Sequence, residues 1–168
     1  MIDLKTHNDL VEARTQELMH VDFASLPLAD IAMAAAEFER ALALPGIVGA
    51  QVPGNAFITV NDAMQARPIL DVANRHRAVV FIHHGPRPGD AWPRVPADAD
   101  NLRRRVGTLD MQASLSANMV TLCLTDLLAD YPNAAVVVHN LGGNIPSGFI
   151  SAYSQNRAVM CRALVVCP

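Results

Sequence analysis

Two runs of apolar residues that each end on histidine constrain the fold of this chain more than any other feature. Residues 78–83 read AVVFIH, and residues 134–139 read AAVVVH. Continuous apolar runs of this length, without polar alternation, are typical of parallel strands that are covered on both faces. We therefore predict strands at 78–83 and 134–139, and we expect the first to be buried on both sides.

Helical patterns alternate with strand patterns along the rest of the chain. Further strands are predicted at 21–26 and 46–52, and helices at about 31–42, 66–75 and 111–130. Asp30 suits the N-cap of the first helix, whose apolar residues fall on one face (Ile31, Ala34, Ala35, Phe38 and Leu42). Strands alternating with helices in this way are typical of a parallel α/β sheet or a (β/α)8 barrel, of which four units are half.

Composition argues against several functional classes. The 13 basic and 16 acidic residues give a net charge of −3, and the basic residues are too scattered for a nucleic-acid surface. No uninterrupted apolar run is long enough to span a membrane, and residues 1–10 lack the pattern of a signal peptide. The three cysteines form no CxxC pair, which favours a reducing compartment. We expect a cytoplasmic protein with neither nucleic acid nor a membrane as partner.

Histidines stand where a parallel sheet binds its ligands. Such sheets bind at the carboxyl ends of their strands, and His83, His84 and His139 lie at or just after two of these ends. Neighbouring strands lie about 4.8 Å apart, so these imidazoles can converge on one metal ion or one substrate. The alternative is a core histidine at 83 that bonds to a carbonyl, with His84 in the loop.

The stretch VVFIHH, followed after one helix by YPNAAVVVHNLGGNIP, resembles the amidohydrolase-related family. More narrowly, it resembles the branch of aminocarboxymuconate semialdehyde decarboxylase and the hydroxybenzoate decarboxylases. The phrase SLPL and the stretch GIVGAQV resemble the family's strand 3 and 4 region, and the likeness covers roughly residues 5–146. The resemblance implies a single domain, residues 1–168, that forms an incomplete TIM barrel of about strands 3 to 6.

The resemblance also implies a site. His83 matches the family's strand-5 metal ligand, and His84, where the family mostly has proline, is a second candidate ligand. His139 matches a histidine that acts as an acid or base in the decarboxylases. The implied cofactor is a divalent metal, with zinc ahead of manganese. The implied reaction is decarboxylation of a small aromatic or unsaturated carboxylic acid, and metal-dependent hydrolysis is the alternative.

Three further residues are candidates for binding the substrate. Arg87 is a natural partner for a carboxylate, Trp92 could cover an aromatic ring, and Asn140 follows His139. The alternative for the first two is a proline-rich surface loop with no ligand.

The sequence departs from the family pattern at two places. The strand-1 pair of metal ligands and the strand-8 aspartate have no counterpart, and residues 147–168 contain no acidic residue and depart from the family pattern. We expect no further strand after 139, weak metal binding, and association with other copies through open strand edges. A truncated, catalytically inactive fragment that only associates with other chains is the third functional alternative.

Overall fold

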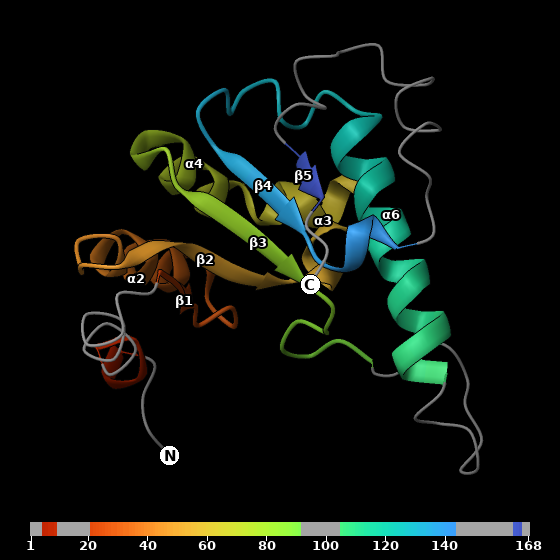
Figure 1. Cartoon of the computed structure of the whole chain (residues 1–168), viewed down its shortest axis with the longest axis horizontal. Coiled ribbons are helices and arrows are strands. Elements are labelled where there is room, and N and C mark those ends of the chain that lie inside the picture. The colour runs from red at the N-terminus through yellow and green to blue at the C-terminus, as the bar shows by residue number, and fades with distance from the viewer. Residues whose placement is uncertain (1–4, 10–20, 92–104, 144–162, 166–168) are drawn as a thin grey trace.

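A five-stranded parallel sheet organises the chain (Figure 1). The structure is a computed structural model that describes residues 5–9, 21–91, 105–143 and 163–165. The strands lie in sequence order and are β1 (Asp22–Ser25), β2 (Ile47–Pro53), β3 (Val79–His83), β4 (Ala135–Val138) and β5 (Ala163–Val165). All neighbouring pairs are parallel. The parallel α/β class predicted from the alternating pattern is confirmed.

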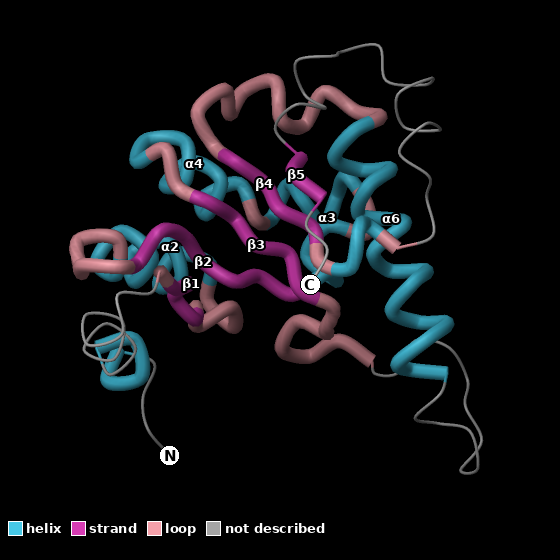
Figure 2. The backbone as a smooth tube through the Cα atoms, viewed as in Figure 1, coloured by secondary structure: helices cyan, strands magenta, loops and turns pink. Residues whose placement is uncertain are grey.

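Helices connect these strands (Figure 2). They are α2 (Ile31–Ala41), α3 (Val60–Gln65), α4 (Arg67–His76) and α6 (Met111–Cys123), and residues 5–9 are also helical. Short turns η1 (Gly54–Phe57) and η3 (Asn140–Gly142) follow β2 and β4, and the π-helical segment η2 (Arg105–Asp110) leads into α6. No helix within the described ranges is long and apolar enough to cross a membrane.

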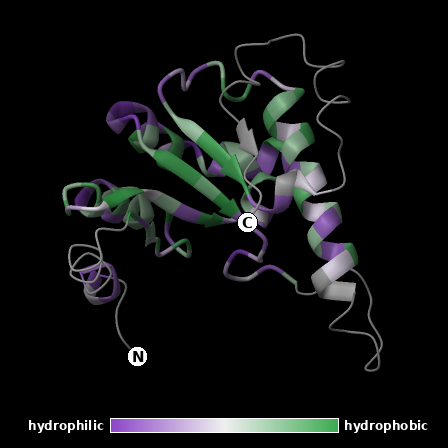
Figure 3. Cartoon of the chain, viewed as in Figure 1, coloured by the Kyte–Doolittle hydropathy of each residue, from purple (hydrophilic) through white to green (hydrophobic). Residues whose placement is uncertain are grey.

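The two faces of the sheet differ in burial. One face packs under the helices, and its residues have no exposed surface: Ala24, Ala50, Val52, Val80, Ile82, Val136 and Val138. On the other face Val79, Phe81 and His83 are only half-buried, although β3 and β4 are largely apolar (Figure 3). The expectation that strand 78–83 is covered on both faces is therefore wrong. A β-branched run fits either situation, because strand propensity does not report what lies over the second face.

Two of the predicted helices form close to their expected bounds. Asp30 caps α2 as predicted, because its carboxylate accepts hydrogen bonds from the amides of Ala32 at 2.9 Å and Met33 at 3.1 Å. Helix α4 ends at Arg77, whose left-handed φ of 55° closes the C-terminus.

The third predicted helix, 111–130, begins where it was expected but ends before the predicted position. Helix α6 ends at Cys123, and the Thr125 hydroxyl donates to the Thr121 carbonyl at 2.6 Å. A side chain that donates to a helical carbonyl competes with the backbone amide that would otherwise bond to it. Leu127 and Leu128 are still buried in the turns that follow, which explains why the apolar pattern looked continuous.

Helix α3 and strand β5 are among the elements that were not predicted. Helix α3 opens with a capping box in which Thr59 and Asp62 bond reciprocally, and the T-x-x-D spacing could have revealed it. Strand β5 pairs in parallel with β4, so the expectation of no strand after 139 is wrong. The rest of segment 147–168 lies outside the described residues.

The outer edge of β1 is occupied by side chains. The amide of Ser25 donates to Asn8 Oδ1 at 3.0 Å, and Asn8 Nδ2 donates back to the Ser25 carbonyl at 3.1 Å. The Phe23 amide donates to the Asp22 carboxylate at 2.8 Å. The Asp22 amide faces the other way and bonds to the Gly46 carbonyl at the start of β2. Strand β1 lies at the edge of the described sheet, as expected, but its outward amides are bonded to side chains, and association through this edge stays a prediction.

We predict that Asn8→Ala lowers the free energy of unfolding by about 2 kcal/mol, because both backbone groups of Ser25 lose their partner. Urea unfolding measures the change, and light scattering should show increased self-association. Asn61→Ala, on the exposed surface of α3, is the matched control and should have little effect. An Asn8 variant as stable and as monodisperse as this control would contradict the role given to Asn8.

Candidate active site

The structure brings His83 and His139 together at the carboxyl end of the sheet. They follow neighbouring strands, and the His139 amide bonds to the Ile82 carbonyl of β3 at 2.9 Å. Their ring centroids are 4.5 Å apart, at an interplanar angle of 37°. Phe81 meets the His139 ring edge-on, with centroids 6.2 Å apart. The two imidazoles thus share the half-buried face of the sheet.

A backbone carbonyl determines the tautomer of His83. Its Nδ1 lies 3.0 Å from the carbonyl oxygen of His84. A carbonyl can only accept, so Nδ1 carries the hydrogen and the neutral ring keeps a lone pair on Nε2. This is the state in which an imidazole binds a metal or accepts a proton.

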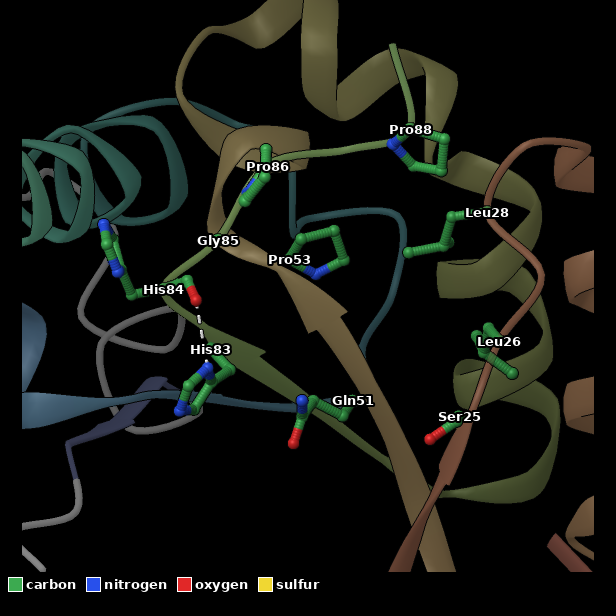
Figure 4. A pocket seen from close by; sticks show the side chains of 10 residues that line it. All are labelled: Ser25, Leu26, Leu28, Gln51, Pro53, His83, His84, Gly85, Pro86 and Pro88. Atoms are coloured by element: carbon green, nitrogen blue, oxygen red, sulfur yellow. Dashed lines mark hydrogen bonds between the residues drawn. The ribbon is translucent and has the colours of Figure 1, made fainter. Parts of the chain in front are cut away.

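The side chain of His84 points away from the His83 side chain and toward α6 (Figure 4). Its Nε2 lies 3.5 Å from Asp110 Oδ2. Asp110 has no exposed surface and stands at the junction of η2 and α6. Sequence reasoning missed Asp110: it directly precedes the predicted helix, but its complete burial has no signature in the sequence.

His139 lies in an environment that favours its neutral form. Burial lowers its pKa from the ordinary value, and the positive charges that His83 and His84 would carry lower it further. Its Nδ1 is buried and has no hydrogen-bond partner among the described residues. His139 can therefore act as a neutral base near pH 7.

We predict that His139 titrates below the usual range in an NMR pH titration, and that His83→Ala moves its pKa upward. The substitution removes a neighbouring charge and part of the burial. A pKa that is lower in the folded chain means that the unfolded chain takes up the proton first. The stability that neutral His139 provides is therefore complete above about pH 6.5, the usual pKa of histidine, and is lost as the pH falls from there through the lower pKa of the folded chain. A His139 pKa at or above about 6.5 would contradict the prediction.

The turn after β4 presses against α6. Asn140, Gly142 and Gly143 all have positive φ, at 52°, 71° and 76°. A Cβ built on Gly143 would lie 2.5 Å from the Gln112 carbonyl oxygen, and one on Gly142 would lie 2.4 Å from the Met119 side chain. The glycine pair thus permits a close approach that fixes the backbone after His139.

A pocket of about 330 Å³ opens beside His83 (Figure 4). Residues of β1, β2 and β3 and of the loops after β1 and β3 line it: Ser25, Leu26, Leu28, Gln51, Pro53, His83, His84, Gly85, Pro86 and Pro88. The carboxyl ends of parallel strands are the usual place for a ligand site in such sheets.

The predicted substrate-binding residues lie outside this pocket or outside the described residues. The Arg87 guanidinium contacts Asp62 at 2.9 Å and Asp90 at 3.2 Å, and its backbone amide also donates to Asp90 at 2.8 Å. Asn140 stands in the η3 turn, and Trp92 lies outside the described residues.

Within the described ranges no three His, Cys, Asp or Glu side chains are grouped for metal binding. A catalytic zinc ion normally has three protein ligands, so the two neighbouring imidazoles of His83 and His139 would not by themselves complete a zinc site.

Comparisons with solved structures identify the fold. One similar structure is an amidohydrolase II, with TM-score 0.68 and 19% identity over 90% of this chain and 49% of that one. Another is a 2,6-dihydroxybenzoate decarboxylase in complex with 2,6-dihydroxybenzoate, with TM-score 0.60 and 18% identity over 83% and 44%. A third is a dihydroxybenzoic acid decarboxylase from Polaromonas sp. JS666 with bound manganese and 2-nitroresorcinol, with TM-score 0.54 and 20% identity over 83% and 43%.

No protein-family model matches the sequence, and a search of curated proteins found no match. The chain spans about half the length of the solved structures it resembles. Their shared architecture and the parallel sheet described above lead to one conclusion: the chain has the fold of about half of an amidohydrolase-type barrel.

Proposed function

We propose that the chain carries part of a metal-dependent decarboxylase site for small aromatic or unsaturated carboxylic acids. The observation that carries the proposal is the pairing of His83 and His139 at 4.5 Å beside the pocket. The similar decarboxylases bind a dihydroxybenzoate, or manganese with 2-nitroresorcinol, which supports a small aromatic acid as the ligand class.

His83 and His139 have different tasks in this proposal. His83 presents the lone pair of Nε2 to a divalent ion, since its Nδ1 is bonded to a carbonyl. The bound ion would supply Lewis-acid polarisation of a substrate oxygen. His139 transfers the proton: when the bond to the carboxylate breaks and CO2 leaves, the carbon takes up one proton, which the neutral imidazole would first take from water and then donate.

The pocket residues and Arg87 have supporting roles. Leu26, Leu28 and Pro53 provide an apolar wall for a ring, and Gln51 offers an amide at the base of the pocket. Arg87, Trp92 and Asn140 remain proposed substrate contacts. Arg87 would have to exchange one of its two carboxylate partners for the substrate.

Mn²⁺ binding, followed by electron paramagnetic resonance, tests the proposal. We predict weak binding that His83→Ala reduces at least tenfold, about 1.4 kcal/mol, whereas His76→Ala has no effect. His76 is the matched control because it is exposed and pairs with Glu39 away from the site. Release of CO2 from 2,6-dihydroxybenzoate in the presence of Mn²⁺, lost in His139→Ala, would establish the reaction. Binding that is unchanged in His83→Ala would overturn the assignment of the ligand.

Two other functions use the same residues. A metal-dependent hydrolase would need the same ion and base, and ester hydrolysis without CO2 release would identify it. An inactive fragment that associates with other chains is favoured by the donor set of two imidazoles and by the half-buried Phe81. Absence of Mn²⁺ binding together with a stable complex in light scattering would identify this alternative.

A further inference from the structure

The backbone of His84 and Gly85 is held from several directions. The His84 carbonyl accepts from His83 Nδ1 at 3.0 Å, and the Gly85 carbonyl accepts from the Asn55 amide at 3.1 Å. A Cβ on Gly54 would lie 3.4 Å from the His83 carbonyl oxygen and 3.7 Å from the His84 Cα. The peptide therefore packs tightly onto η1.

The side chain of His84 contacts Asp110, the residue directly before α6. Its Nε2 stands 3.5 Å from the carboxylate of Asp110, and only 12% of the His84 side chain is exposed. Little water can therefore replace this contact. A buried carboxylate beside an imidazole favours an N–H on the nitrogen that faces it, so the pair restrains the orientation of the ring.

Helix α6 is itself fixed to η1 and the residue after it. The amide nitrogen of Asn118, when turned toward the carbonyls around it, donates to Gly54 at 2.8 Å and to Phe57 at 3.2 Å. The Thr121 hydroxyl donates to the Ile58 carbonyl at 2.9 Å. Segment 54–58 and α6 thus form one frame. The backbone next to His84 is bonded to this frame through Asn55, and the His84 side chain contacts Asp110, which directly precedes α6.

We infer that His84 and Asp110 are positioning residues that hold the His84 carbonyl where it selects the Nδ1–H tautomer of His83. The inference rests on the proposed function, in which His83 Nε2 binds the ion. It assigns His84 a different task from direct metal binding. His84 acts through its backbone oxygen, and Asp110 acts through the imidazole of His84.

The test compares His84→Gln, Asp110→Asn and Asp110→Ala with the parent chain. Long-range ¹H–¹⁵N correlation NMR of the metal-free protein reports the tautomer of His83, whose signals are assigned with His83→Ala. Glu39→Ala, which breaks the exposed contact to His76, is the matched control. The parent and the control should show a protonated Nδ1. His84→Gln and Asp110→Ala should shift His83 toward the Nε2–H tautomer, with a smaller shift in Asp110→Asn.

Mn²⁺ affinity gives a second measurement. Loss of an outer partner of a ligand typically lowers metal affinity 10- to 100-fold, and we expect a loss in this range for His84→Gln and Asp110→Ala. The tautomer of His83 is measured without metal, so it tests the inference even if the parent chain binds no Mn²⁺. A parent chain that binds no Mn²⁺ overturns only the proposed function. His84→Gln decides the matter if the Asp110 variants do not fold.

Two results would overturn the inference. One is a His83 tautomer that stays on Nδ1 in both His84→Gln and Asp110→Ala. The other is a loss of Mn²⁺ binding in His84→Gln without any change of tautomer, which would make His84 a metal ligand.

Discussion

A methyl group added at Gly49 is expected to lower the free energy of unfolding by about 3 kcal/mol or more. The Cβ of Gly49→Ala would lie 2.2 Å from the carbonyl oxygen of Val79 and 2.8 Å from its carbonyl carbon. Both atoms belong to the backbone of β3, so no side-chain rotation relieves the overlap. Strands β2 and β3 pair at this position, and the pairing of β1 with β2 is irregular beside it.

Thermal unfolding followed by circular dichroism measures this effect, which corresponds to a fall in Tm of roughly 6 to 12 °C. Gly54→Ala is the informative comparison, because the nearest atom there is the side-chain nitrogen of Asn118 at 3.0 Å. That side chain can adjust, so Gly54→Ala should cost less. A Gly49→Ala variant that melts within about 2 °C of the parent would show that the strands separate easily.

The second large effect is expected at Gly143, where Gly143→Ala should cost about 3 kcal/mol and displace His139. Its φ of 76° disfavours any L side chain. The added Cβ would also lie 2.5 Å from the Gln112 carbonyl oxygen and 2.8 Å from the Ser116 amide of α6. The turn after His139 must then withdraw from α6.

Gly89→Ala is the control that separates the two causes of this loss. Gly89 has a φ of 87° and nothing within 4 Å of an added Cβ, so it reports backbone strain alone. We expect Gly143→Ala to lower Tm more than Gly89→Ala and to weaken the nuclear Overhauser effects between the rings of His83 and His139. Equal losses of Tm with unchanged ring contacts would show that α6 does not position His139.

The sequence allowed the main frame of the molecule to be predicted for local reasons. Apolar runs that end on histidine gave two strands, and Asp30 before an amphipathic face gave α2. The approach of His83 and His139 follows from strand order, because adjacent parallel strands end side by side. These features depend on short stretches or on one simple rule of topology.

Other features could not be predicted because they depend on packing between distant segments. The His84 side chain turns toward Asp110, which is 26 residues further along the chain. The half-buried state of Phe81 depends on what lies over the second face of the sheet, and its own strand carries no information about that. Helix α6 ends at Cys123, just before Thr125, whose hydroxyl bonds to the Thr121 carbonyl, and the apolar pattern does not report this.

The side chains of Asn8 and Asp22 also limit how copies of this chain can join. Extending a sheet from molecule to molecule in series requires the first strand of one copy to pair with the last strand of the next. The outward amides of Phe23 and Ser25 in β1 already donate to side chains, so a strand added at this edge would have to displace those hydrogen bonds. Asn8 and Asp22 thus disfavour open-ended growth through β1.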